Sequence, residues 1–310
     1  MQEIMNKRFD VLGLGAVAID DLLILDEFPK PDNKYTVRVS ERHAGGLTGT
    51  ALVAAAKMGC STVYAGTLGA DEGSAFIERK LREAGVSTDH IVRRDETRPF
   101  HSTILIDNSK KTRTILADAL NVVGADSGLP SEEFIRSVGV LFVDHVGLEG
   151  MIRASLIARD AGIPIVADFE SRHPAPFDQL FSLADHLILP LDFALELSGA
   201  GDGKKAALDL WDSGRNAVVV TVGAEGSWYM SSEDPGKIHH QSAFPVEVAD
   251  TTGCGDVFHG AYAAGLRKGM PMAGRIRFAS AVAALKATHI GGQEGIPSLG
   301  EVEAFLKARN

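Results

Sequence analysis

The sequence predicts an α/β fold, with a mainly parallel central sheet flanked by helices and a small additional β-sheet. Short β-branched runs alternate with longer helical patterns along most of the chain, and two regions interrupt this alternation with strand-like segments only. A strand, a helix and a second parallel strand join through a right-handed crossover, so their repetition covers both faces of the sheet with helices. No linker or repeat divides the chain, and we expect one domain over residues 1–310.

The expected strands are short apolar runs bounded by turn residues, and the expected helices carry apolar residues at spacings of three and four. In the second helix, for example, Phe76, Ile77 and Leu81 share one face, and Gly85 ends the pattern. The strands are expected at residues 10–15, 62–65, 138–144, 163–168, 186–189 and 217–222. The helices are expected at residues 48–58, 73–84, 150–161, 204–213, 255–268 and 273–288.

The two irregular regions predict strands outside the main alternation. Residues 19–25 read as a strand, and residues 102–106 and 112–116 flank the turn residues of a hairpin. We expect the segments at about 18–42 and 98–118 to form a lid over the crevice at the carboxyl ends of the parallel strands. The alternative is that they are edge strands added to the main sheet.

Composition excludes several classes of protein. A net charge of −10 and a pI near 5.5 argue against a surface for nucleic acid or an anionic membrane. Two cysteines, Cys60 and Cys254, cannot form a disulfide framework and favour a reducing compartment. No apolar run approaches the roughly 18 residues of a membrane span. We therefore expect a cytoplasmic protein with a small-molecule ligand.

Two phosphate-binding motifs can be rejected. Residues 13–18 fit the dinucleotide fingerprint GxGxxA, but that motif must open a helix, and here a strand-like segment follows. The P-loop pattern GxxxxGK[ST] is absent from the sequence. The adjacent residues His239 and His240 suit a surface strand better than a metal site.

The most informative segment is Asp-Thr-Thr-Gly-Cys-Gly-Asp at residues 250–256, which leads directly into an apolar helix. Gly253 and Gly255 allow a tight turn that points backbone N–H groups outward at the helix start, where the helix dipole also favours an anion. Asp256, in the first helical turn, can act as a base beside that anion site. Thr251 and Thr252 offer hydroxyl groups. The alternative is an ordinary helix cap, since Thr and Asp favour such positions.

The order of residues in this segment closely resembles the signature of the PfkB/ribokinase family of sugar and nucleoside kinases. Gly45, Gly46 and residues 51–59 resemble the N-terminal signature of the same family, and residues 221–226 resemble its T-x-G-x-x-G nucleotide loop. Residues 277–279 and 291–297 resemble its C-terminal nucleotide region. The resemblance spans nearly the whole chain. It implies a ribokinase-like three-layer α/β sandwich with a β-sheet lid that often mediates dimers.

By matching position, the resemblance implies a role for each part of the signature. Asp256 would be the base that takes the proton of a sugar hydroxyl, and the backbone of Gly253, Cys254 and Gly255 would complete an anion hole with it. Asp250 and Thr252 match positions that bind a monovalent cation, such as K⁺. The nucleotide would be held by residues of two segments, namely Thr221, Gly223, Gly226, Gly253 and Gly255.

The sugar would be bound by four residues of the N-terminal part, namely Asp20, Gly45, Gly46 and Thr50. Adjacent residues of a strand point to opposite faces, so only one of Asp20 and Asp21 can face the crevice. The alternation of side chains along the strand does not show which of the two faces the crevice, whereas the resemblance implies that it is Asp20. Thr50 stands where the family often has Asn, so one sugar contact is shortened or lost.

Two departures from the family pattern concern the metal and the substrate. The N-x-x-E segment that organises Mg²⁺ should fall at residues 191–194, where this chain has Leu-Asp-Phe-Ala, which leaves Asp192 to act through water. The C-terminal patterns look most like the branch of sulfofructose kinases and ketohexokinases. No Arg that matches a sulfonate site is identified, so the sugar is not assigned.

These observations predict an enzyme that uses ATP and Mg²⁺, and K⁺ at the cation positions, to phosphorylate a hydroxyl of a pentose, hexose or ketose. We expect a homodimer formed through the lid. One alternative is a nucleoside kinase of the same family, which the few aromatic residues of the lid disfavour. The other is a non-catalytic protein that binds ligands on the kinase fold, which the missing N-x-x-E segment favours and Asp256 opposes.

Overall fold

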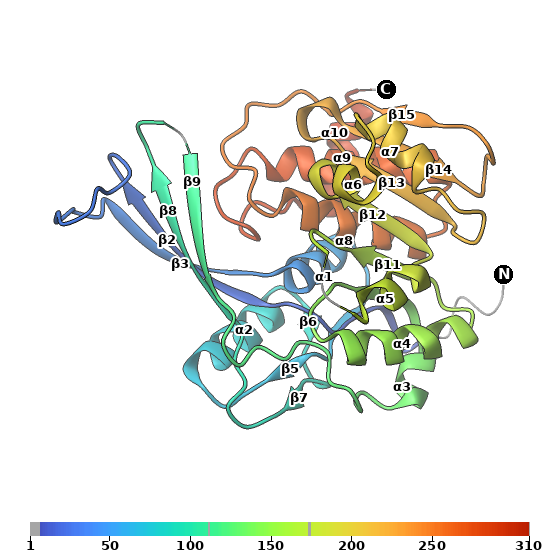
Figure 1. The fold of residues 1–310 in the computed structure, drawn as a ribbon, viewed down its shortest axis with the longest axis horizontal. Helices are drawn as coiled ribbons and strands as arrows, with labels where there is room; N and C mark the ends of the chain where they lie inside the picture. Colours follow the sequence, from blue (N-terminus) through green and yellow to red (C-terminus); the bar gives the residue numbers. More distant parts are fainter. Residues whose placement is uncertain (1–6, 111, 173–174, 310) are drawn as a thin grey trace.

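The central sheet of the described chain has nine strands in the order β15-β14-β13-β12-β11-β10-β1-β4-β6 (Figure 1). The structure is a computed structural model that describes residues 7–110, 112–172 and 175–309. All neighbours from β6 to β13 pair in parallel, and β14 and β15 add antiparallel strands at one edge. The strands are β1 (Phe9–Gly13), β4 (Thr62–Tyr64), β6 (Val86–Ser87), β10 (Val138–Val143), β11 (Ile165–Asp168), β12 (His186–Pro190), β13 (Ala217–Thr221), β14 (Ser227–Ser231) and β15 (His239–Gln241).

Helices cover both faces of this sheet because successive side chains of each strand point to opposite faces. In β10, Val140 and Phe142 pack into one core, whereas Leu141 and Val143 pack into the other. The first core is covered by α1 (Leu47–Lys57), α2 (Glu72–Glu83), α8 (Cys254–Arg267), α9 (Met272–Lys286) and α10 (Leu299–Lys307). The second is covered by α3 (Glu132–Arg136), α4 (Leu148–Asp160), α5 (Phe177–Leu183), α6 (Leu191–Ser198) and α7 (Gly203–Asp209).

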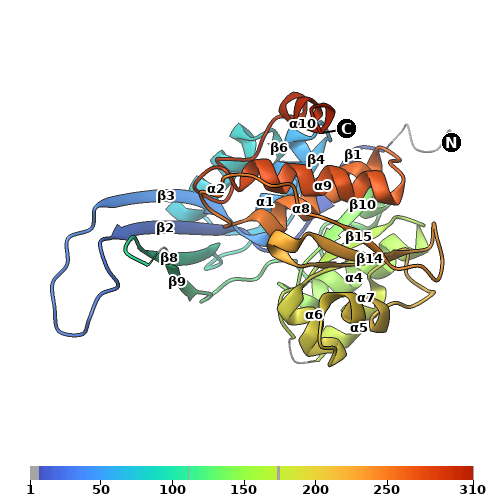
Figure 2. The ribbon, with the colours of Figure 1, turned by 90° about the horizontal axis from the view of Figure 1, so that it is seen from above.

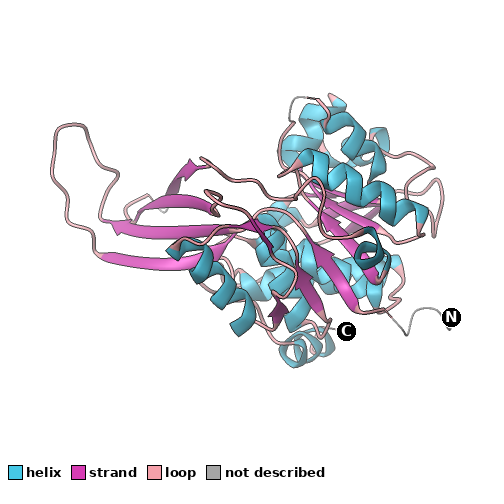
Figure 3. Cartoon of the chain, turned by 90° about the horizontal axis from the view of Figure 1, so that it is seen from below, coloured by secondary structure: helices cyan, strands magenta, loops and turns pink. Residues whose placement is uncertain are grey.

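A second sheet projects from this body (Figures 2 and 3). Its strands are β2 (Ala18–Leu25), β3 (Val39–Gly45), β8 (Phe100–Asp107) and β9 (Thr112–Asp118), in the order β3-β2-β8-β9. β2 pairs in parallel with β8, and the other two pairings are antiparallel. The loop of residues 26–38 extends from its far end. These strands form no part of the nine-stranded sheet, so the edge-strand alternative is wrong.

The predicted elements of the central sheet and its helices are all present, and the predicted α/β fold is confirmed. The predicted hairpin forms as β8 and β9, and His239 and His240 lie in β15, as expected of a surface strand. The helix predicted at 204–213 is shorter than expected, because α7 ends at Asp209 and the Asp212 side chain accepts a bond from the Gly214 N–H in a turn. Helices α3, α5, α6 and α10 were not predicted. Among the described helices, none is long and apolar enough to cross a membrane.

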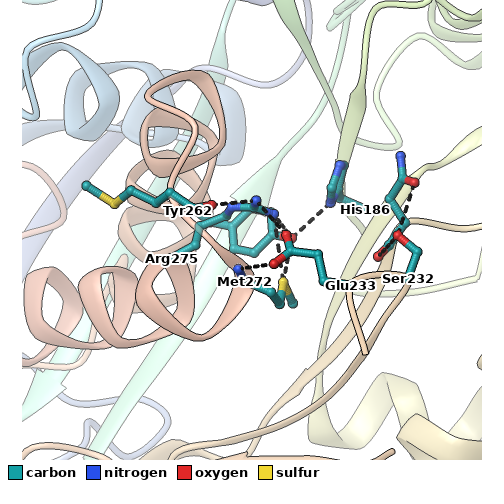
Figure 4. Close-up of polar contacts among 8 residues, drawn as sticks. His186, Ser232, Glu233, Tyr262, Met272 and Arg275 are labelled. Atoms are coloured by element: carbon teal, nitrogen blue, oxygen red, sulfur yellow. Dashed lines mark hydrogen bonds and ion pairs between the residues drawn. The ribbon is translucent and has the colours of Figure 1, made fainter. Parts of the chain in front are cut away.

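Buried polar side chains join α8, α9 and β12 at the amino ends of the strands, where His186 begins β12 (Figure 4). Arg275, which is 5% exposed, donates from Nη1 to the Tyr262 hydroxyl at 3.1 Å and lies over its ring. Burial lowers the pKa of His186 to about 3, so its neutral ring can accept a bond from Tyr262 at 2.9 Å. Glu233 accepts from the Met272 N–H at 2.7 Å and approaches Arg275 at 3.3 Å.

Replacing Arg275 should weaken the packing of α9 on α8. Arg275→Met removes a buried cation, and its partners then lose their hydrogen bonds. We expect this to lower the free energy of unfolding by about 3 kcal/mol. A loss of that size should lower the thermal midpoint by roughly 5 °C. Arg277→Met, on the same helix but less buried, is the matched control and should change the midpoint less. Equal midpoints for the two variants in calorimetry would show that the cluster does not stabilise the fold.

Candidate active site

Polar residues gather at the carboxyl ends of the parallel strands. Asp144 follows β10, Asp168 ends β11 and Thr221 ends β13. Because parallel strands all end at the same edge of a sheet, these residues line one edge. The start of α8 lies there too, since Asp168 acts electrostatically on Asp256 in the first turn of that helix. The candidate site is therefore this edge of the sheet, where open α/β sheets form their ligand-binding crevice.

The glycines of the rejected fingerprint have a packing role beside this crevice. The Asp144 carboxylate is fully buried and accepts bonds from the Ala16 N–H at 2.7 Å and the Thr48 hydroxyl at 2.8 Å. A Cβ on Gly15 would lie 2.1 Å from that carboxylate, so only glycine fits. The motif at residues 13–18 thus joins β1 to β10 through Asp144.

The loop before α8 has the backbone form that the sequence predicts. Gly253 has φ +74°, and a Cβ on it would also lie 2.9 Å from the Gly292 carbonyl oxygen. A Cβ on Gly255 would meet nothing within 4 Å, so open space adjoins this helical residue. The N–H groups of Gly255 and Asp256 belong to the first turn, where amides have no acceptor within the helix. The start of α8 can therefore donate hydrogen bonds to an anion.

Asp250 fixes the shape of this loop. Its Oδ1 accepts bonds from the Thr252 N–H at 2.9 Å and hydroxyl at 2.7 Å, and its Oδ2 accepts from the Gly291 N–H at 3.0 Å. Its carbonyl oxygen accepts from Lys286 Nζ at 3.1 Å. Burial alone would raise the pKa of Asp250, but the bonds from Thr252 and Gly291 outweigh burial and lower it. Asp250 is therefore an anion held from several sides.

The projecting sheet reaches the same loop through Arg113 of β9, a residue that the sequence reasoning missed. Its Nη1 donates to the Thr252 hydroxyl at 2.9 Å and lies 3.6 Å from Asp250 Oδ1. A hairpin residue 137 positions before the loop carries no sequence signal for this contact, because only the arrangement of the two sheets brings them together. The contact places a second positive charge at the loop.

Asp256 has the properties of a base. Its side chain is half-buried. Burial, together with the nearby carboxylates of Asp168 and Glu170, raises its pKa well above the ordinary value of an aspartate. A carboxylate with raised proton affinity is better matched to removing a proton from a hydroxyl near neutral pH. The sequence predicted the position of this residue but not the carboxylates that raise its pKa.

Asp168 is the most unusual of those carboxylates. It is 2% exposed, its Oδ1 lies 3.4 Å from His259 Nε2, and its Oδ2 has no hydrogen-bond partner within the part of the chain that the structure describes. Burial raises its pKa well above the usual range. A buried carboxylate oxygen without a partner suits a site for a hydrated divalent cation. Glu170, exposed two residues later, adds a second carboxylate.

The segment at residues 191–194 offers a weaker donor set. It forms the first turn of α6, where Ala194 is fully buried and Asp192 is exposed. A buried alanine at that place cannot supply the carboxylate of the N-x-x-E pattern, which leaves Asp192 as the carboxylate of this turn. The role of Asp192 stays a prediction.

The structure distinguishes Asp20 from Asp21. Asp21 accepts hydrogen bonds from Nε and Nη2 of Arg42, at 2.7 and 2.8 Å, and also contacts His101. The bonds from Arg42 lower the pKa of Asp21 to about 2. Asp20 instead acts electrostatically on Asp256, and burial raises its pKa. Asp20 therefore belongs to the crevice, whereas Asp21 is occupied by an ion pair.

The partners of Asp20 come from the neighbouring strands. Ser102 of β8 and His43 of β3 lie opposite Asp20 in the two registers, and Ser102 hydrogen-bonds its carboxylate. The Glu294 carboxylate, 2.8 Å from His43 Nδ1, raises the pKa of His43 to about 9, so this ring is positively charged near neutral pH. A Cβ on Gly45 would lie 2.1 Å from Asp20 Oδ2, which explains a glycine there.

Gly46 and Thr50 position α1 rather than facing open space. Gly46 has φ +89°, and a Cβ on it would lie 2.6 Å from Val17 Cα. Thr50 is 1% exposed, and its hydroxyl accepts a bond from Gln293 Nε2 at 3.3 Å. The predicted contact of Thr50 with a ligand is thus restricted by burial, and Gln293 is the amide that lies beside it.

The predicted nucleotide residues lie at the end of β13 and in the turn after it. Thr221 donates to the Leu189 carbonyl at 3.4 Å, and Gly223 is exposed with φ +57°. A Cβ on Gly226 would lie 1.9 Å from the Gln241 carbonyl oxygen, so this glycine is required by packing. The Cys254 thiol, whose pKa burial raises, lies 3.7 Å from the Ala283 carbonyl oxygen and is not activated.

Comparison with known proteins finds a family and several relatives that this chain resembles in sequence and in fold. A family model described as pfkB family carbohydrate kinase matches residues 10–299. The chain is 27% identical to a ribokinase of Haemophilus influenzae, over 98% of this chain and 99% of that one. It is 25% identical to a 5-dehydro-2-deoxygluconokinase of Shouchella clausii, over 98% of each chain. A solved structure of a candidate ribokinase from Agrobacterium tumefaciens matches with a TM-score of 0.88 and 29% identity, over 97% of this chain and 98% of that one. These relatives do not test the resemblance to the sulfofructose kinase and ketohexokinase branch, which stays a prediction.

Proposed function

Since the chain belongs to the pfkB family of carbohydrate kinases, we propose that it transfers the γ-phosphoryl group of ATP to a hydroxyl of a neutral pentose, hexose or ketose. The observation that carries this proposal is the position of Asp256, a carboxyl of raised pKa in the first turn of α8. It places a base beside backbone donors for an anion, and phosphoryl transfer requires mainly positioning and charge stabilisation.

In the proposed reaction, Asp256 accepts the proton of the sugar hydroxyl. The hydroxyl oxygen forms a bond to the γ-phosphorus while the bond between that phosphorus and the bridging oxygen of ADP breaks. The N–H groups of Gly255 and Asp256 donate to the transferring phosphoryl oxygens, where negative charge must be stabilised. Gly253, with its positive φ, gives the turn that aims these groups.

The nucleotide would lie along the carboxyl ends of the strands, with Thr221, Gly223 and the loop before α8 beside it. When bound, Mg²⁺ supplies positive charge to the ATP phosphates. Asp168, with its unpartnered buried oxygen, and Glu170 are the carboxylates that would hold it, with Asp192 acting through water. These donors fit a hard cation that keeps most of its water.

The sugar would bind between the two sheets. Asp20 of β2 would accept bonds from sugar hydroxyls, and Gly45 lets the sugar approach the backbone of β3. The carboxylates of Asp20, Asp256 and Glu294 make this space unfavourable for an anionic substrate, although His43 offsets part of their charge. An uncharged sugar therefore suits it best.

We propose that the projecting sheet is a lid that closes this space. It supplies Asp20 to the crevice and Arg113 to the loop before α8. Exposed apolar side chains on and beside its edge strand, Ile115, Leu116 and Leu120 at 49–65% exposure, support the prediction that two copies associate through the lid. Sedimentation of the protein with Leu116→Glu, which should favour the monomer, tests this association.

K⁺ at Asp250 and Thr252 stays a prediction of the sequence. It is supported by the oxygen atoms of the two side chains. Those atoms already have protein partners, and Arg113 and Lys286 bring positive charge to the same loop. A comparison of rates in different monovalent salts decides this point.

A screen for ADP release tests the proposed function. The purified protein is given ATP and Mg²⁺ with one acceptor at a time, and the product is examined by ³¹P NMR. The acceptors are neutral sugars (pentoses, hexoses and ketoses), anionic sugar acids, and nucleosides. We expect ADP and a phosphate monoester with at least one neutral sugar. ADP release with nucleosides alone would support the alternative kinase, and no release with any acceptor would contradict the proposal.

Removing the base should stop turnover without unfolding the protein. Asp256→Asn keeps the shape of the side chain but cannot accept the proton, so kcat should fall by on the order of 10²–10⁴. A thermal melt and an ATP-binding measurement on the same sample serve as controls and should change little. Near-normal turnover by the folded variant would show that Asp256 is not the base.

Asp20 and Asp21 offer a matched pair of variants. Asp20→Ala should lower kcat/KM for the sugar at least tenfold, because charged hydrogen bonds to hydroxyls are worth about 1.5–3 kcal/mol each, while the KM for ATP moves little. Asp21→Ala, which breaks the ion pair with Arg42, should leave kcat/KM nearly unchanged. The reverse order of effects would place the sugar on the other face of β2.

A further inference from the structure

Lys286 is fully buried, at 0% exposure, although lysine is among the residues least often buried. It is the last residue of α9, which packs along α8. A buried ammonium is costly unless oxygen atoms replace its hydration. Its surroundings must therefore supply those oxygens.

The loop before α8 supplies an oxygen to the ammonium, and the end of α9 holds that loop in place. Lys286 Nζ donates to the Asp250 carbonyl oxygen at 3.1 Å. The Ala287 carbonyl oxygen in turn accepts from the N–H groups of Ala249 and Asp250, at 2.8 and 3.1 Å. The last carbonyls of a helix carry partial negative charge, which favours a cation there. Lys286 thus joins the end of α9 to the loop that starts α8.

The ammonium also lies within electrostatic range of the site. The charges of Asp250 and Asp256 act on Lys286, as does the positive charge of Arg113. A cation fixed behind the loop offsets the carboxylates of the crevice and holds the loop in one form. A carboxylate and backbone carbonyls are also the oxygen groups that bind an alkali or ammonium ion.

We propose that Lys286 is a positioning residue that acts as a built-in monovalent cation for the loop of residues 250–253. This inference rests on the proposed kinase function. Its ε-ammonium holds the Asp250 carbonyl and keeps the amides of Gly255 and Asp256 aimed at the transferring phosphoryl group. Catalysis then needs no K⁺, Na⁺ or NH₄⁺ from solution, the opposite of what a bound alkali ion at Asp250 and Thr252 would give.

The salt response of the wild-type enzyme is the first test. Rates of ADP release with an active sugar are compared in KCl and in tetramethylammonium chloride at equal ionic strength. We expect rates that agree within about twofold. A wild-type rate more than about fivefold higher in KCl would overturn the inference and assign the loop to an external cation. Absence of ADP release with every acceptor of the screen, in both salts, would instead overturn the kinase proposal itself.

Removing the ammonium is the second test. Lys286→Met keeps a long apolar stem but no charge, and in tetramethylammonium chloride we expect kcat to fall at least tenfold. K⁺ or NH₄⁺ should then restore kcat at least fivefold and raise the thermal midpoint of the variant, effects that a merely structural lysine would not show. A folded Lys286→Met with unchanged kcat, or one that no cation restores, would contradict the inference.

Lys268→Met is the matched control. Lys268 also donates from Nζ to a backbone carbonyl, that of Met58, but it lies at the opposite end of α8. The kcat of the Lys268→Met variant should stay near normal and should not respond to K⁺. If Lys286→Met does not fold, Lys286→Gln replaces it in the same comparison, and the wild-type salt response still decides between a built-in and an external cation.

Discussion

The chemistry of the site depends on the attraction between a group of carboxylates and the positive end of one helix. Carboxylates collect where the parallel strands end, and the positive start of α8 lies near them. Neither group is favourable alone, because buried carboxylates repel one another and the amides of a helix start need acceptors. Burial, together with this repulsion, raises the pKa of Asp256, so the cost of gathering acids at one edge becomes the property that suits Asp256 to the proposed role of base.

The positive charges of the site come from parts of the chain that are distant in sequence. Arg113 reaches the loop before α8 from the projecting sheet, and Lys286 reaches it from the end of α9. Asp250 binds both and is fixed by Gly291 as well. The position of the loop thus depends on how the projecting sheet and α9 pack against it. A movement of the projecting sheet should therefore affect the proposed phosphoryl site as well as the proposed sugar site.

The fold and the central loop could be predicted from the sequence, because each has a local signal. Alternating strands and helices predict the sheet, and the glycines at 253 and 255 predict the form of the helix start. The register of β2 could not be predicted, since Asp20 and Asp21 are equivalent until the ion pair with Arg42 is known. Asp168, Arg113 and Lys286 carry no motif, and only tertiary packing gives them their roles. Thr50 shows the reverse case, a motif position that packing buries.

The most direct test of this account is the pH dependence of kcat/KM in the wild type and in Glu170→Gln. In the proposed reaction the rate requires ionised Asp256, so it should fall as the pH drops through a pKa well above the ordinary value of about 4 for an aspartate. A neighbouring negative charge favours the protonated form, and its removal in Glu170→Gln should shift this fall to lower pH. A wild-type profile that falls only near pH 4, or one that Glu170→Gln leaves in place, would contradict the claim that gathered carboxylates prepare Asp256 as the base.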